Sequence, residues 1–142
     1  MNILVTGGCG YKGSVLIPRL LAKGYKVTSF DTQWFGSFLE PHANLKNIKG
    51  DIRDLSDLNF NEYSTIIHFA NVANDPAVEL NPTMSWEINV LASQQIADLA
   101  IRSGVKQIIY ASSGSVYGIK QEEKVTEDLP LVPISVYNKT KM

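Results

Sequence analysis

Short strand-like segments alternate with longer stretches of helical spacing along this chain. Five segments have the length and flanking residues of strands: residues 3–5, 25–30, 47–50, 65–70 and 107–111. Helical spacing appears at residues 11–22 and 82–103, where the second stretch has apolar Trp86, Val90, Ile96, Leu99 and Ala100. Near-continuous apolar strands joined by helices are typical of a parallel sheet covered on both faces. The pattern therefore predicts an α/β fold with three layers and a doubly wound sheet, in which segment 107–111 is a buried fifth strand.

A glycine-rich turn follows the first strand, with the sequence Thr6-Gly7-Gly8-Cys9-Gly10-Tyr11-Lys12-Gly13. In a dinucleotide-binding turn of this spacing, Gly7 permits the tight turn and Gly10 lets the backbone approach a pyrophosphate. Gly13 lets the following helix pack close to the strand. The amino end of that helix offers unpaired N–H groups and a partial positive charge to phosphates. These features predict a Rossmann-type fold, whereas the alternative is a merely flexible glycine turn.

Asp31 ends the second predicted strand, at about the separation expected of a residue that binds ribose hydroxyls. A carboxylate at this place would repel the 2′-phosphate of NADP, and no arginine directly follows Asp31 to receive that phosphate. The sequence therefore predicts NAD as the cofactor.

Composition excludes several other classes of protein. The formal net charge of −1 gives no electrostatic case for binding nucleic acid or an acidic membrane surface. No apolar run reaches the roughly 18 residues that would span a membrane, and a signal peptide is not recognisable. The single cysteine, Cys9, has no partner for an internal disulfide, and no Cys/His cluster indicates a metal. A cytoplasmic location is expected by default.

Tyr137 and Lys141 are candidate catalytic residues. In a helix they would share one face, and Tyr137 is the only tyrosine in the chain with lysine at the fourth following position. A lysine ammonium close to a phenol lowers the pKa of the phenol, which makes it a useful acid and base near neutral pH. The alternative is a solvated helix face, and the dinucleotide-binding context favours catalysis.

The chain resembles the amino-terminal part of an extended short-chain dehydrogenase/reductase of the NAD-dependent sugar epimerase/dehydratase group. The matching segments run nearly end to end and in family order. They are residues 6–13, Asp31, Asp51-Ile52, His68-Phe69-Ala70, Asn89-Val90, residues 111–118 and residues 137–141.

This resemblance implies roles in cofactor binding. Asp51 would bond the adenine amino group, with Ile52 beside the ring. The adenosine-side ribose and the pyrophosphate would be lined by Phe69, Ala70 and Asn71. Further cofactor-binding positions are Tyr11, Lys12, Ser112, Tyr137 and Lys141. For Lys12, where the family usually has an apolar residue, contact with the pyrophosphate and a place along the surface are both open.

The resemblance also implies a catalytic set. Ser113 matches the catalytic Ser/Thr of the family, Tyr137 would be the acid and base, and Lys141 would hold the nicotinamide ribose. Dehydratases of the group carry an Asp-Glu pair directly after the catalytic Ser/Thr, whereas Gly114-Ser115 stands here, which disfavours dehydration. His68 is expected to be a packed strand residue.

Residues 1–142 are thus predicted to be an NAD-binding domain that is incomplete, because members of the family run to roughly twice this length. The substrate domain is expected to be absent, and a fragment of a longer enzyme is favoured over a natural short form. The short last helix of the chain is expected to pack poorly, and the chain alone is expected not to turn over substrate. The resemblance implies a nucleotide-sugar 4-epimerase that acts by transient oxidation at C4 and hydride return, as a homodimer. The alternatives are a nucleotide-sugar dehydrogenase or reductase of the same family, and a non-catalytic NAD-binding sensor.

Overall fold

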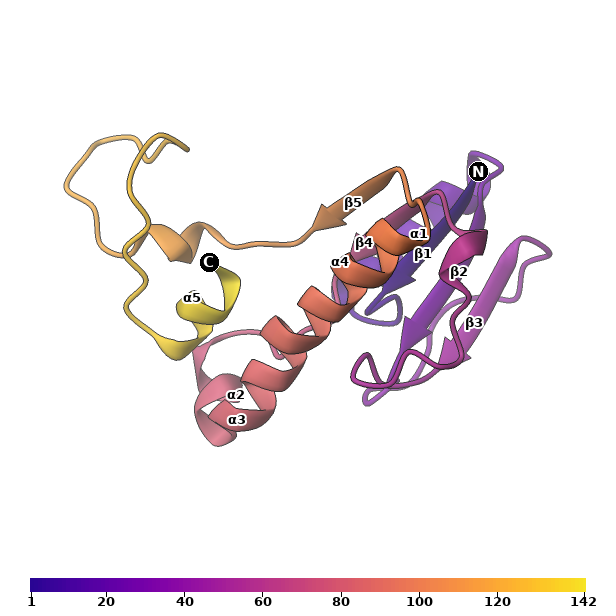
Figure 1. The fold of residues 1–142 in the computed structure, drawn as a ribbon, viewed down its shortest axis with the longest axis horizontal. Coiled ribbons are helices and arrows are strands. Elements are labelled where there is room, and N and C mark those ends of the chain that lie inside the picture. Colours follow the sequence, from indigo (N-terminus) through magenta and orange to yellow (C-terminus); the bar gives the residue numbers. More distant parts are fainter.

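A parallel sheet of five strands forms the centre of the molecule (Figure 1). The computed structural model describes residues 1–142. The strands are β1 (Asn2–Thr6), β2 (Lys26–Asp31), β3 (Leu45–Lys49), β4 (Thr65–His68) and β5 (Gln107–Tyr110). The helices are α1 (Tyr11–Ala22), α2 (Asp75–Leu80), α3 (Pro82–Trp86), α4 (Ala92–Arg102) and α5 (Val136–Lys141). Single helical turns lie at Phe60–Glu62, Glu87–Leu91 and Gly114–Tyr117, of which the second is a π turn.

The strand order is β3-β2-β1-β4-β5, and every neighbouring pair is parallel. This confirms the predicted Rossmann-type, doubly wound sheet. The first βαβ unit builds outward from β1 toward β3, and the second builds from β4 toward β5. The order of the strands therefore reverses beside β1, where ligands bind beyond the carboxyl ends of the strands in this class of sheet.

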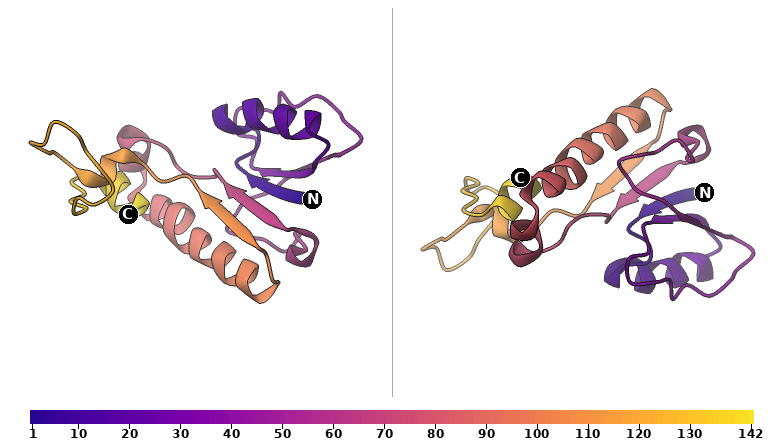
Figure 2. Two further views of the ribbon diagram at one scale, coloured as in Figure 1. Left: turned by 90° about the horizontal axis from the view of Figure 1, so that it is seen from above. Right: turned by 90° about the horizontal axis from the view of Figure 1, so that it is seen from below.

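Alternating residues of the strands bury their side chains on opposite faces of the sheet. On one face, Ile3 and Val5 pack with Ile17 of α1. On the other, Leu4 and its neighbours pack with Ile96 of α4. Figure 2 shows α1 and α4 on opposite sides of the sheet, which gives the three predicted layers.

The strand β5 differs from the prediction that it is buried. Ile108, Ile109 and Tyr110 are 39%, 45% and 38% exposed. The reason is that β5 is hydrogen-bonded to β4 on one side only and forms an edge of the sheet. An apolar sequence alone therefore does not ensure burial when the strand lies at the edge of the sheet.

The predicted helix at residues 82–103 is present as α3, the π turn and α4 in succession. Its buried stripe runs through Ser85, Ile88, Ala92, Ile96 and Ala100, so the prediction was right for Ile96 and Ala100. It was wrong for Trp86, which is 42% exposed, because this residue lies next to the stripe rather than on it. No helix in the structure is long and apolar enough to cross a membrane.

Two short helices pack together beyond the carboxyl edge of the sheet (Figure 1). The first, α2, was not predicted, although Asn74 accepts a hydrogen bond from the Ala77 amide at 3.1 Å and so caps it. The second is α5, which the sequence predicts to pack poorly. The structure instead buries Thr140 and Lys141 at 4% exposure each, and Asn89 Nδ2 donates to Thr140 Oγ1 at 3.1 Å.

Candidate functional site

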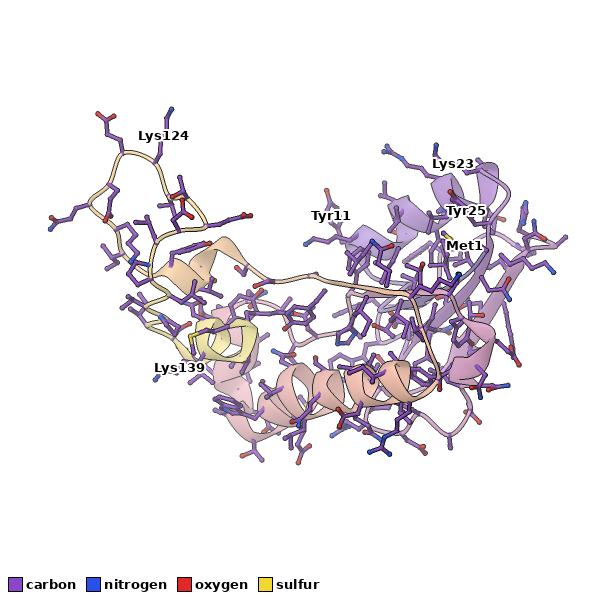
Figure 3. The ribbon with its side chains drawn as sticks, turned by 45° about the horizontal axis from the view of Figure 1, so that its top comes forward. Met1, Tyr11, Lys23, Tyr25, Lys124 and Lys139 are labelled. Carbon is purple, nitrogen blue, oxygen red and sulfur yellow. The ribbon has the colours of Figure 1, made fainter.

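A cavity of about 770 Å³ opens beyond the carboxyl ends of β1, β2 and β4. Its lining includes every predicted site residue except Gly13: the glycine turn, Asp31, the segments after β3, β4 and β5, and two residues of α5. The fold therefore brings together residues that lie as far apart as Gly7 and Lys141 in the sequence. Tyr11 also lines it, although this side chain is 91% exposed and projects outward from the start of α1 (Figure 3).

The glycine turn has no room for side chains. Gly7 has a φ of +69°, and a Cβ there would lie 2.5 Å from the Ala70 amide nitrogen. A Cβ on Gly13 would lie 2.3 Å from the Gly8 carbonyl oxygen, so Gly13 lies behind the cavity and sets the approach of α1 to the turn. Gly10 is the N-cap of α1, and no side chain caps this end of the helix. The first N–H groups of α1 are thus free for an anionic ligand.

Asp31 is held in a fixed orientation at the end of β2. Its Oδ2 accepts a hydrogen bond from the Cys9 amide at 3.1 Å, and its Oδ1 accepts one from the Gln33 amide at 2.6 Å. Each carboxylate oxygen can accept more than one hydrogen bond. Asp31 can therefore brace the glycine turn and still receive both hydroxyls of a ribose. Together with the open cradle of the turn, this arrangement fits a dinucleotide.

Asp51 lines the same cavity but is already engaged. Its two oxygens accept hydrogen bonds from the Arg53 guanidinium at 2.7–3.2 Å, and Arg53 also contacts Glu87 at 3.1 Å. The hydrogen bond from Arg53 holds the pKa of Asp51 below its ordinary value. An adenine amino group at Asp51 would therefore share the carboxylate with Arg53, and the predicted contact stays a prediction.

Lys141 is the last residue of α5, is buried, and lines the cavity. Its Nζ donates to the Ala111 carbonyl oxygen at 3.1 Å and lies 4.9 Å from the centre of the Tyr110 ring. Burial, with a smaller contribution from the positive charge of Lys12, lowers the pKa of Lys141 to about 8. Lys12 lines the same cavity as Lys141.

Tyr137 and Ser113 reach the cavity from different elements. The predicted helix at residues 137–141 is present, and Ser135 caps it by accepting from the Asn138 amide at 3.1 Å. Tyr137 and Lys141 both line the cavity, and the Tyr137 hydroxyl makes no hydrogen bond with the chain. The Ser113 hydroxyl lies 2.8 Å from that of Ser115. Both Ser113 and Tyr137 therefore present hydroxyl groups to a bound molecule.

His68 is buried in β4, as the sequence predicts for a packed strand residue. Its Nδ1 contacts Thr6 Oγ1, and its Nε2 lies 2.8 Å from Ser93 Oγ. The Ser93 hydroxyl donates to the Asn89 carbonyl oxygen at 2.8 Å, so His68 Nε2 must be the donor to Ser93. Burial lowers the pKa of His68 to about 4, which keeps the ring neutral.

Asn89 braces the loop after β4. Its Oδ1 accepts from the Val72 amide at 2.8 Å, and its Nδ2 donates to the Val72 carbonyl oxygen at 3.0 Å. This paired contact, made from the π turn, holds the segment that carries Asn71 along the cavity wall. Irregular helical turns of this type often occur near functional sites.

Several cavity residues were missed by the sequence analysis, among them Trp34, Phe35 and Asp75. Trp34 and Phe35 line the cavity from the loop after β2, and Asp75 lines it from the start of α2. The Oδ1 atom of Asp75 is buried without a hydrogen-bond partner. A usable signal was present, because two adjacent aromatic residues stand three and four positions after Asp31.

The fold and the cavity define a dinucleotide-binding α/β domain. A family model described as "NAD dependent epimerase/dehydratase family" matches residues 3–142. The chain belongs to this family, which is NAD-dependent and includes enzymes that act as isomerases and oxidoreductases. The earlier resemblance is thereby confirmed.

Similar proteins and solved structures agree with membership of this family. The chain is 31% identical to a UDP-glucose 4-epimerase of Corynebacterium glutamicum, over all of this chain and 44% of that protein. It is 27% identical to the Thermus thermophilus UDP-glucose 4-epimerase solved with NAD, with a TM-score of 0.88 over 99% of this chain and 46% of that one. DesIV of Streptomyces venezuelae, a dTDP-glucose 4,6-dehydratase solved with NAD, is 28% identical with a TM-score of 0.89 over 99% of this chain and 48% of that one. The chain thus spans about half the length of the relatives it matches.

Proposed function

We propose that this chain is the NAD-binding part of a nucleotide-sugar 4-epimerase. The observation that carries the proposal is that Ser113, Tyr137 and Lys141 line the same cavity as the glycine turn and Asp31. A non-catalytic NAD sensor would need the cofactor residues alone. The catalytic set therefore favours an enzyme that oxidises a hydroxyl of its substrate.

Cofactor-binding roles follow from the geometry. The amino end of α1 and Lys12 would hold the pyrophosphate, because free N–H groups and a cation attract an anion there. Asp31 would hold the adenosine ribose, and Lys141 the nicotinamide ribose. When bound, NAD supplies the reversible hydride acceptor that oxidation and re-reduction of a sugar carbon require.

The catalytic roles belong to two hydroxyl groups. Ser113 would hydrogen-bond the sugar 4-hydroxyl and orient it, and the Tyr137 phenolate would remove its proton. Lys141 follows Tyr137 by one helical turn and lines the same cavity. When the sugar carbon is reduced again, Tyr137 would give the proton back to its oxygen.

Epimerisation is favoured over dehydration by the turn that follows Ser113. Dehydration needs an acid that protonates the departing hydroxyl, and the turn Gly114–Tyr117 carries no carboxyl group. Its Ser115 lies in the cavity wall and bonds to Ser113 instead. Dehydratases are nevertheless among the structural relatives, so the activity is decided by experiment.

The test uses the protein purified at its full natural length. We expect it to interconvert C4 epimers of a nucleotide sugar, with little net change in NADH absorbance during turnover. Stoichiometric reduction of added NAD would indicate a net dehydrogenase instead, and absence of turnover over a panel of sugar nucleotides would indicate a sensor.

A variant set tests the mechanism. Tyr137→Phe is expected to reduce turnover by about 10² or more, the usual effect of losing a positioned acid and base, with NAD affinity almost intact. Ser113→Ala should cost less. The matched control is Tyr25→Phe, since Tyr25 lies at the opposite end of α1 from Tyr11 (Figure 3) and does not line the cavity. Near-normal turnover of Tyr137→Phe would contradict the mechanism.

A further inference from the structure

An exposed pair of aromatic side chains stands at the cavity wall beside Asp31. Trp34 is 60% exposed and Phe35 is 88% exposed, although both residues line the cavity. Large aromatic groups left in water at the wall of a cavity are a sign of a binding surface. The roles proposed above for the glycine turn, Asp31 and α5 make no use of this pair.

The pair forms the tip of a tight turn that is anchored on both sides. The Gly36 amide donates to the Gln33 carbonyl oxygen at 2.9 Å, so Trp34 and Phe35 are the two central residues of a β-turn. On one side, the Gln33 amide donates to Asp31 Oδ1 at 2.6 Å. On the other side, Asn47 Nδ2 of β3 donates to Ser37 Oγ at 2.9 Å. These anchors fix the aromatic tip relative to the carboxylate that faces the ribose.

Two residues from the segment after β3 give the cavity that holds this tip a part of its apolar lining. Gly50 lines the cavity there, and a Cβ on it would lie 2.4 Å from the Phe30 ring, so the lining must stay flat at this position. Ile52 adds an apolar side chain that is 4% exposed. A flat, apolar wall with an aromatic ring available beside it fits a planar heteroaromatic group. Asp31 Oδ2 accepts from Cys9 of the glycine turn and Oδ1 accepts from Gln33 beside the tip, so a base at the tip would place its ribose at Asp31 and its phosphates at the glycine turn.

We infer that the Trp34–Phe35 turn is an adenine clamp, in which Trp34 stacks on the base of the bound dinucleotide and Phe35 covers its outer edge. Stacking of a base on an aromatic side chain typically changes affinity by roughly fivefold to 150-fold. The clamp acts on the cofactor's adenosine half and does not depend on the reaction proposed above.

Fluorescence of the 142-residue chain tests the clamp. The chain has two tryptophans, and Trp86 does not line the cavity, so Trp86→Phe leaves Trp34 as the sole reporter. We expect NAD and AMP to quench or shift the emission of Trp34, whereas nicotinamide mononucleotide should leave it unchanged. Unchanged emission at NAD concentrations that calorimetry shows to be saturating would overturn the inference, as would failure of the chain to bind NAD.

Calorimetry of substituted chains gives an independent measure. Trp34→Ala should raise the Kd for NAD and for AMP about tenfold, and Trp34→Phe should restore most of the affinity. The matched control is Phe38→Ala, because Phe38 is 78% exposed in the same loop but does not line the cavity. Equal affinity of Trp34→Ala and the unsubstituted chain would contradict the clamp, and thermal unfolding of each variant verifies that it is folded.

Discussion

The neutral ring of His68 joins three elements through a single chain of hydrogen bonds. The Ala70 amide donates to Thr6 Oγ1 at 3.4 Å, and the Thr6 hydroxyl then donates to His68. His68 in turn donates to Ser93, which links β4 to α4. In the neutral ring Nδ1 accepts from the Thr6 hydroxyl, whereas both nitrogens of a protonated ring donate, so protonation would reverse that hydrogen bond. The direction of the hydrogen bond made by Thr6, the residue before Gly7, thus depends on the protonation state of the buried His68.

Stability should therefore fall in mild acid. The pKa of His68 is about 4 in the folded chain and ordinarily about 6.5. The unfolded state takes up the proton first, so the free energy of unfolding decreases as pH falls from about 6.5 to 4, by up to roughly 3 kcal/mol. Urea unfolding at several pH values measures this slope. A His68→Gln chain should lose most of the slope, and an unchanged slope in that variant would contradict the assignment.

The burial of the Lys141 ammonium group at the cavity is expected to lower the stability of the fold. Its pKa is about 8 in the folded chain and 10.5 ordinarily, so burying the charged form is unfavourable. The cost is fully present below pH 8 and is relieved as pH rises from about 8 to 10.5, over which the free energy of unfolding should increase.

The Lys141→Met substitution tests this cost. The variant should be more stable than the unsubstituted chain at pH 7, by about 1 kcal/mol, and should bind NAD more weakly. Thermal unfolding and calorimetry measure the two effects. A less stable variant would show that the hydrogen bond to the Ala111 carbonyl outweighs the burial of the charge.

At the scale of single elements, the close approach of α1 to the glycine turn depends on Gly13. An alanine in the interior of a helix is normally favoured over glycine by about 1 kcal/mol. At Gly13 the added Cβ would meet three backbone atoms of Gly8 at 2.3–2.6 Å. The backbone must move to relieve that contact, and the movement would displace the cradle of the turn.

We expect Gly13→Ala to reverse the usual helix preference. The variant should lose about 1–3 kcal/mol of unfolding free energy, as in other overpacked sites, and should bind NAD more weakly. Val15→Ala on the exposed face of α1 is the matched control for helix propensity. Thermal unfolding of both variants measures the difference, and a Gly13→Ala chain as stable as the control would argue against a close approach in solution.

Elements with strong periodicity were predictable, and those set by tertiary contacts were not. The strand before the glycine turn and the helix after it appear as expected because glycine and apolar spacing act locally. The exposure of Trp86 and of β5 depends on what packs beside them, which no local pattern encodes. The capped helix α2 was not predicted, because six residues are too few to show helical spacing.

For the whole molecule, the open edge at β5 has a consequence for association. The strand offers unpaired backbone groups on one side and carries the partly exposed side chains of Ile108 and Ile109. Such edges pair readily with other strands.

We expect the 142-residue chain to self-associate as its concentration rises. Ile109→Lys should reduce the association, because a charge on an edge strand opposes pairing. Sedimentation velocity over a range of concentrations measures both chains. If the unsubstituted chain stayed monomeric throughout that range, association through the edge strand β5 would be contradicted.

The location of the candidate site could be predicted from the sequence, but the contacts of several of its loop residues could not. Residues on separate strands converge because parallel strands end at one edge of the sheet, so Asp31 and Ser113 could be placed together from the sequence. The engagement of Asp51 by Arg53 and the aromatic turn at Trp34 arise from loop geometry, which the sequence pattern leaves undetermined.

The central claim is that this fold holds NAD through the glycine turn and Asp31. Calorimetric titration of the chain with NAD and with NADP tests it most directly. We expect NAD to bind at least about 100-fold more tightly, equivalent to roughly 2.7 kcal/mol, because NADP would place a phosphate against the Asp31 carboxylate. Asp31→Asn should reduce that preference sharply. Equal affinities for NAD and NADP in the unsubstituted chain would contradict the claim.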